Sequence, residues 1–140
     1  IMFGVNYRQL IEDKAAQLGI TEQLLFFDSP FPHESSQAVY LVEQYERDDL
    51  VLVFVLGSYM KSSKHHHETP MLEEIYFHIA GESFVSVGEA ELALNHSQHS
   101  IEVPLNASHQ VRTQENPALT LIIMKKARLV PPGRLHIKDV

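Results

Sequence analysis

The sequence predicts an all-β protein, a sandwich or barrel of short strands with one short helix near its N-terminal end. Three observations support this prediction. Beyond residue 36 the helical spacing of apolar residues disappears, and β-branched or aromatic runs alternate with turn residues. The turns recur regularly, as they do in sandwiches and barrels. The runs 50–56 and 119–124 are apolar at nearly every position, which indicates strands covered on both faces.

The helix is expected over about residues 6–19. Asn6 is the candidate N-cap, Gln9 follows at the capping-box spacing, and Gly19 is the candidate terminator. The apolar positions between them are Tyr7, Leu10, Ile11, Ala15 and Leu18. We expect this helix to cover one outer face of the sheet and a partner subunit to cover another, so a homodimer is predicted.

The strands are expected near 38–46, 50–56, 63–67, 74–79, 84–87, 90–94, 100–103, 109–113 and 118–125. A polar, proline-containing stretch over 28–36 precedes them. The barrel therefore spans about 38–126, and the tail 127–140 is expected to run over the surface. A length of 140 residues predicts a single domain over 1–140.

The composition excludes several classes of protein. Cysteine is absent, which rules out disulfide scaffolds, thiolate zinc sites and cysteine nucleophiles. Eleven basic residues face 18 acidic ones without a basic stripe, which argues against a nucleic-acid partner. The longest apolar run is too short to cross a bilayer and no signal-peptide pattern is present, so we expect no membrane partner and a cytoplasmic location.

The densest polar feature is the histidine run inside residues 64–68. A strand's period of two puts His65 and His67 on one face and His66 on the other. A solvated polar loop is the alternative interpretation. The segment 72–81 favours a site, because it reads as a strand that carries two carboxylates near its start and ends at a turn glycine.

Together these segments resemble the first motif of the cupins. In that motif two histidines one residue apart precede a glutamate, six further residues and a glycine, and His65, His67, Glu74 and Gly81 fit in this order. The spacing to the glycine selects Glu74, with Glu73 as the alternative. Six residues separate His67 from Glu74, where the family usually has three or four.

The segment 104–109 resembles the second cupin motif, which has a proline, a turn and then a histidine. His109 is that histidine, and Asn106 stands at the usual glycine, where asparagine tolerates a left-handed conformation. The family's leading glycine falls at Gln98 and its closing asparagine at Thr113, so neither is kept. The resemblance covers about 51–125.

The resemblance implies a small single-domain member of the RmlC-like cupin superfamily, a jelly-roll barrel or double-stranded β-helix. It also implies a divalent transition metal, Fe, Mn, Ni or Zn, on His65, His67, Glu74 and His109. Imidazoles with one carboxylate suit such ions, and six-coordination leaves two positions open for a substrate.

If Glu74 faces the barrel interior, strand alternation points Tyr76 and His78 inward as well. They are the candidate catalytic residues, with a hydrogen-bonded core tyrosine and a satisfied buried histidine as the alternatives. His99 is a weaker candidate for supporting a ligand. The outward residues of this strand are expected to be Ile75, Phe77 and Ile79. His33, His96 and His136 lie in predicted loops or the tail and are expected to be surface histidines without a site role.

The predicted function is that of a metal-dependent enzyme acting on a small polar organic substrate. A sugar or keto-acid isomerase and a dioxygenase are both open, because cupins host many activities. The segment Leu72–Phe77 after a spaced histidine pair is somewhat similar to uronate isomerases of this superfamily. The alternative is a non-catalytic cupin that binds a small ligand.

Overall fold

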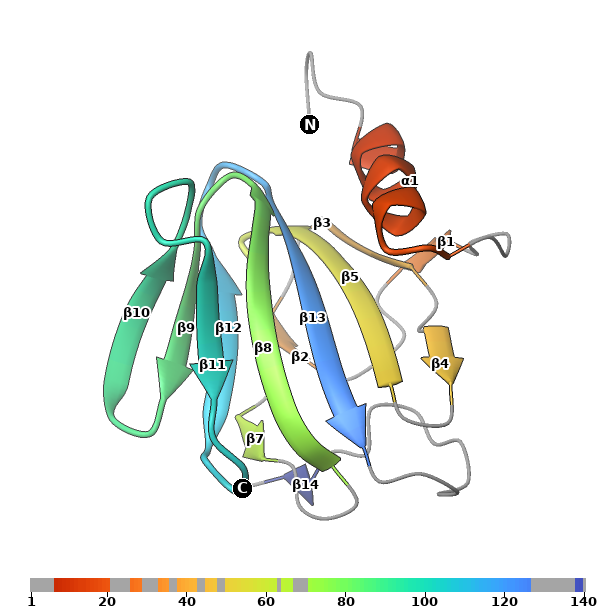
Figure 1. The fold of residues 1–140 in the computed structure, drawn as a ribbon. Helices are drawn as coiled ribbons and strands as arrows, with labels where there is room; N and C mark the ends of the chain where they lie inside the picture. The colour runs from red at the N-terminus through yellow and green to blue at the C-terminus, as the bar shows by residue number, and fades with distance from the viewer. Residues whose placement is uncertain are drawn as a thin grey trace.

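The structure is a computed structural model. It describes residues 7–20, 26–28, 33–35, 38–42, 45–47, 50–62, 64–66, 71–126 and 138–139. Helix α1 (Tyr7–Gln17) precedes the strands (Figure 1). These are β1 (Phe26–Asp28), β2 (His33–Ser35), β3 (Ala38–Val42), β4 (Tyr45–Arg47), β5 (Leu50–Ser58), β6 (Lys61–Ser62), β7 (His65–His66), β8 (Met71–Ala80), β9 (Ser83–Val87), β10 (Ala90–Leu94), β11 (Ser100–Val103), β12 (His109–Thr113), β13 (Ala118–Lys126) and β14 (Lys138–Asp139).

The strands form two antiparallel sheets, each of seven strands among the described residues. The first has the order β1-β3-β5-β13-β8-β11, with β4 also paired to β5. The second has the order β10-β9-β12-β6-β2, and in it β7 pairs with both β12 and β14. The predicted all-β class with a short N-terminal helix is confirmed.

The main core lies between the two sheets. On β5 the alternate residues Val51, Val53 and Val55 face this core, which also includes Tyr76 of β8 and Val85 of β9. Its remaining buried members are Met60, Leu94, Ile101, Val103, Val111, Ile122 and Met124. The interior is therefore filled by alternate side chains from both sheets, as strand geometry requires.

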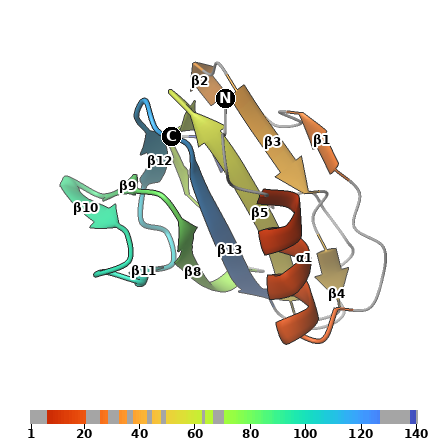
Figure 2. The same cartoon turned by 90° about the horizontal axis from the view of Figure 1, so that it is seen from above.

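The outer face of the first sheet is covered by α1 (Figure 2). The intervening residues of β5 and β13 pack there against Ile11, Ala15 and Ile20. These sheet residues are Leu52, Phe54, Leu56, Leu119 and Leu121, and Phe77 and Ile79 of β8 pack against the same cluster. The apolar runs of β5 and β13 are thus buried on both faces, as predicted, while the homodimer stays a prediction.

Gly19 ends the helical segment as predicted. Its φ is +78°, and the N–H groups of Gly19 and Ile20 donate to the carbonyls of Ala16 and Ala15. This is the Schellman arrangement, in which glycine supplies the left-handed residue. The proposed N-cap, Asn6, lies outside the described residues. No helix in the described part of the chain is long and apolar enough to cross a membrane.

Several predicted boundaries were wrong. The expected strand 38–46 contains β3 and β4, with residues 43–44 outside the described residues, and the expected strand 63–67 contains β7, with residues 63 and 67 outside them, while β6 lies before that range. The polar stretch 28–36, for which no strand was predicted, contains β2, and the tail contains β14, which pairs with β7. Strands of two or three residues carry no readable alternation, because long-range pairing alone defines them.

Candidate metal centre

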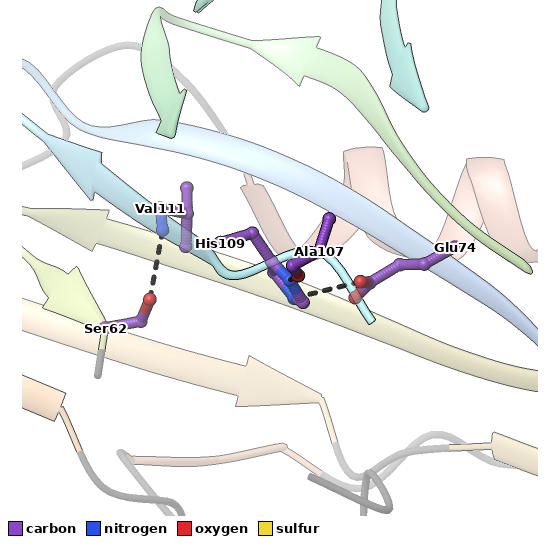
Figure 3. Close-up of polar contacts among 5 residues, drawn as sticks. All are labelled: Ser62, Glu74, Ala107, His109 and Val111. Carbon is purple, nitrogen blue, oxygen red and sulfur yellow. Dashed lines mark hydrogen bonds and ion pairs between the residues drawn. The ribbon is translucent and has the colours of Figure 1, made fainter. Parts of the chain in front are cut away.

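Two polar side chains meet inside one end of the barrel, between the sheets. Glu74 comes from β8 and His109 begins β12, and both are buried, with exposures of 5% and 0%. His109 Nε2 lies 2.9 Å from Glu74 Oε1 (Figure 3). Glu73, the alternative carboxylate, instead has its Oε2 3.6 Å from Lys125 Nζ. The structure therefore brings Glu74 to His109.

The imidazole of His109 is oriented by the turn before it. Its Nδ1 lies 2.9 Å from the carbonyl oxygen of Ala107, which accepts a hydrogen bond from the Nδ1 proton (Figure 3). In the neutral ring this places the lone pair on Nε2, which faces Glu74. Asn106 in this turn has φ +65°, so the left-handed conformation predicted for it is confirmed.

His65 lies beside His109 on the neighbouring strand. The two residues are register partners of β7 and β12, and their ring centroids are 4.3 Å apart. Strand β6, which precedes β7, is hydrogen-bonded to β12 through Ser62, whose hydroxyl accepts a hydrogen bond from the Val111 N–H at 3.0 Å (Figure 3). Gln110 Nε2 also donates to the Ser62 carbonyl at 2.7 Å. These two bonds hold Ser62, at the end of β6, against β12.

Tyr76 completes this group from β8. It is 1% exposed, and its ring centroid is 6.1 Å from that of His109. Burial raises the pKa of the Tyr76 phenol well above its ordinary value, and the charge of Glu74 and a hydrogen bond to Glu74 raise it further. The phenol therefore keeps its proton at neutral pH, and its O–H donates a hydrogen bond to the Glu74 carboxylate.

The donor chemistry of this group suits a transition metal, since such ions take imidazole nitrogen and carboxylate oxygen. The 2.9 Å between Nε2 and Oε1 matches adjacent ligands of a six-coordinate ion, about 3.0 Å apart at ligand distances of roughly 2.1 Å. Yet no three His, Asp or Glu side chains within the described ranges are spaced to hold an ion. His67, the other predicted ligand, lies outside those ranges. The fit to a metal ion therefore rests on two donor atoms, His109 Nε2 and Glu74 Oε1, with the ring of His65 beside His109.

A small cavity adjoins Glu74 and His109. Its volume is about 10 Å³, close to what one water molecule needs. The lining residues are Glu73, Glu74, Val103, Pro104, Leu105, His109 and Met124. The space beside the pair is therefore the size of one ion or water.

His78 is not part of this group. It follows Glu74 by four positions on β8, about 13 Å at the rise of an extended strand. It lines a separate hollow with His96, and its ring centroid is 5.9 Å from that of His99. His96 and His99 thus lie near His78, although the sequence predicted no site role for His96 and placed His99 only as a possible support for a ligand. The spacing His96-x-x-His99 in a turn was the available signal.

The fold and this group define a two-sheet antiparallel barrel with an imidazole–carboxylate pair inside one end. Comparison with known protein families and with curated proteins gives no match. Solved structures do match. A cupin-2 domain protein from Rhodospirillum rubrum is 15% identical, with 81% of this chain and 78% of that one covered at a TM-score of 0.60.

Two further structures extend the comparison. KdgF from Halomonas sp. is 15% identical, with 77% of this chain and 97% of that one covered at a TM-score of 0.56. The DMSP lyase DddQ from Ruegeria pomeroyi DSS-3 is 26% identical, with 62% of this chain covered at a TM-score of 0.51. That match spans 43% of the lyase, less than half its length. The chain has the cupin fold, as the sequence motifs predicted.

Proposed function

We propose that this protein is a metal-binding cupin in which Glu74 and His109, with His65 and His67, hold a divalent transition-metal ion. The 2.9 Å contact between the buried Nε2 and Oε1 atoms carries this proposal. Because Nδ1 bonds to the Ala107 carbonyl, a neutral His109 presents a lone pair to the carboxylate. Two lone pairs at this distance need a positive species between them, a proton or a metal ion.

Metal analysis distinguishes these two occupants. The full chain, produced without a histidine tag and loaded in turn with Fe(II), Mn(II), Ni(II) or Zn(II), is expected to retain one ion at this site after dialysis. His109→Ala removes a proposed ligand and is expected to lose that ion. His66→Ala is the matched control, because strand alternation turns it away from His65. Equal retention by both variants would show that a proton, and not a metal, joins the pair.

We further propose that the protein is an enzyme that moves a proton on a small polar organic substrate, as in the isomerisation of a sugar or keto acid. A bound ion would polarise adjacent carbonyl and hydroxyl oxygens of such a substrate. Tyr76 supports the proposal, because its phenol holds a proton beside Glu74 and His109. Its donated hydrogen bond holds the phenol in one orientation against the Glu74 carboxylate.

The comparison supports this class of reaction only in general terms. The DMSP lyase match names a lyase, and eliminations, like isomerisations, commonly begin with removal of a proton from carbon. His78 has no place in the proposed step, because it lines the separate hollow. Tyr76 is the one predicted catalytic residue that lies against the Glu74–His109 pair.

Exchange of substrate protons tests the reaction. The metal-loaded chain is incubated in D₂O with a panel of uronates, keto sugars and keto acids, and deuterium uptake at carbon is followed by NMR. Tyr76→Phe is expected to lower the exchange rate by about 10²–10⁴-fold while the ion is retained. Oxygen consumption with diketones under Fe(II) would instead indicate a dioxygenase. Tight ligand binding without turnover in the loaded chain would indicate a binding protein.

A further inference from the structure

A second group of histidines lies at the end of the barrel opposite Glu74. A hollow of about 680 Å³ opens there between the end of β8 and the turns that follow β10 and β12. Figure 1 shows these three segments together at the top of the sheets. The lining residues are His78, Ala80, Gly81, Glu82, Asn95, His96, Gln114, Glu115 and Asn116. The function proposed above uses none of them.

The chemistry of this lining favours a cation. It consists of imidazoles, two carboxylates and three side-chain amides, and it includes neither lysine nor arginine. The whole chain carries a formal charge of −7, so no surplus of positive charge opposes a cation. Imidazole nitrogens distinguish the hollow from an all-oxygen site, and they select transition metals over Ca²⁺ or Mg²⁺.

The pair His78 and His99 has the geometry to share such an ion. Their ring centroids are 5.9 Å apart at an angle of 57°. Two imidazoles on one ion, with N–metal distances of roughly 2.0–2.1 Å, place their centroids about 4.5 Å apart at a right angle, about 5.2 Å apart at the tetrahedral angle and about 6.4 Å apart when opposite, so the observed pair fits an ion held between the two rings at a wide angle. The backbone fixes the pair, because the His78 N–H donates to the His99 carbonyl at 2.8 Å.

One nitrogen of the His78 ring is already committed to the protein. The ring hydrogen-bonds to the backbone of Gly81. A ring held in this way by a backbone carbonyl presents its other nitrogen as the ligand, which is the usual arrangement around bound metals. Burial lowers the pKa of His78, and His99 and His96 lower it further.

The rim of the hollow is held by its own hydrogen bonds. Asn95 donates to Glu82 at 2.8 Å, and its side-chain oxygen accepts the N–H groups of Ser97 and Gln98 at 2.9 and 3.0 Å. On the other side Tyr59, at φ +52°, donates its N–H to the Gln114 carbonyl at 2.8 Å. A bulky residue rarely adopts this conformation, and such strain concentrates at functional sites.

We propose that a divalent transition-metal ion binds at the edge of this hollow, between His78, which lines it, and His99, whose ring lies beside that of His78, with His96 and Glu82 at the rim. The site is separate from Glu74 and His109. Two histidines form it, with water completing the coordination, since no third His, Asp or Glu converges with them in the described part of the chain. Its affinity is therefore expected to be lower than that of a site with three or four protein ligands.

Paramagnetic broadening locates the ion directly. Cu²⁺ is titrated into the ¹⁵N-labelled full chain, and amide signals of residues 78–82 and 95–99 are expected to broaden together. The His99→Ala variant is expected to need at least ten times more Cu²⁺ for the same broadening. His99 is exposed, so this variant is expected to fold. Ser97→Ala, an exposed position in the same turn, is the matched control and is expected to titrate like the unaltered chain.

The outcomes separate this proposal from the one above. Broadening confined to residues around Glu74 and His109 would overturn the second site and leave the first intact. Broadening around His78 and His99 alone would support the second site and count against the first. Equal weakening in His99→Ala and Ser97→Ala would show that disturbance of the turn, and not loss of a ligand, caused the effect, and would overturn the proposal.

Discussion

Alanine at Gly81 and at Gly88 tests the role of the first motif's glycine. Both glycines have left-handed backbones, with φ of +72° and +61°. A Cβ on Gly81 would overlap the Pro117 carbonyl oxygen and lie 2.9 Å from Ala118 Cα, whereas a Cβ on Gly88 would meet nothing within 4 Å. The two glycines share a similar backbone conformation but differ in whether neighbouring atoms would touch an added Cβ. Comparing the two variants therefore isolates the cost of the close contact between the turn at Gly81 and the turn at Pro117.

The backbone conformation alone costs about 1–2 kcal/mol for an L-residue, so Gly88→Ala is expected to lower the free energy of unfolding by that amount. Overpacking adds about 1–3 kcal/mol, so Gly81→Ala is expected to cost about 2–5 kcal/mol. Urea unfolding with EDTA present measures both, because bound metal would otherwise add its own stabilisation. Two variants of equal stability would refute the reasoning that Gly81 is required by close contact.

Asn106→Gly is expected to preserve or slightly raise the free energy of unfolding, and Asn106→Ala to lower it by about 1 kcal/mol, since φ is +65° there; urea unfolding of both variants checks this order. Leu121→Ala beneath α1 is expected to cost about 2–5 kcal/mol, against about 0.5 kcal/mol or less for the exposed Leu92→Ala. A hydrogen bond from Arg112 lowers the pKa of Glu91, so this surface pair stabilises the fold above the unfolded pKa of Glu91 and the effect is lost as pH falls through the folded pKa. NMR titration of Arg112→Gln is expected to show the Glu91 pKa rising toward its ordinary value.

The sequence predicted the parts of the fold that local patterns encode. The apolar run of β5 is long enough to show burial on both faces, and Gly19, the predicted helix terminator, and Asn106, the predicted turn residue, both adopt the left-handed backbone. The strands β2 and β14 were missed, because two or three residues give no period. Their pairing partners, β6 and β7, are far away in the sequence, and pairing at that distance is not encoded locally.

For the candidate metal centre, strand alternation predicted which side chains of β8 face the interior, but not which of them lie at the same end of the barrel. Alternation along β8 correctly put Glu74 and Tyr76 on the interior face, and the structure brings both to His109. Alternation also put His78 on that face, but parity defines a face and not a depth along the barrel. His78 therefore lies at the other end of the barrel, near His99, through the pairing of β8 with the chain before β11.

The buried pair of Glu74 and His109 can serve either the stability of the fold or the binding of a metal ion, and the two roles can be separated by mutation. Removing one partner of a buried ion pair costs about 3–5 kcal/mol, whereas replacing the whole group by apolar side chains is often neutral or stabilising by about 1–4 kcal/mol. Tyr76 belongs to the group, because Glu74 accepts its hydrogen bond. If the group is kept for metal binding, the triple variant Glu74→Leu, His109→Leu and Tyr76→Phe should bind no ion at this end.

In EDTA this triple variant should then unfold at a free energy equal to or above that of the unaltered chain, while Glu74→Leu alone should be less stable. Measuring both in urea separates the cost of a broken pair from the net contribution of the intact one. A triple variant as unstable as the sum of its single changes would show that these side chains hold the two sheets together. The contact between Nε2 and Oε1 would then be structural, and the metal site would lose its main support.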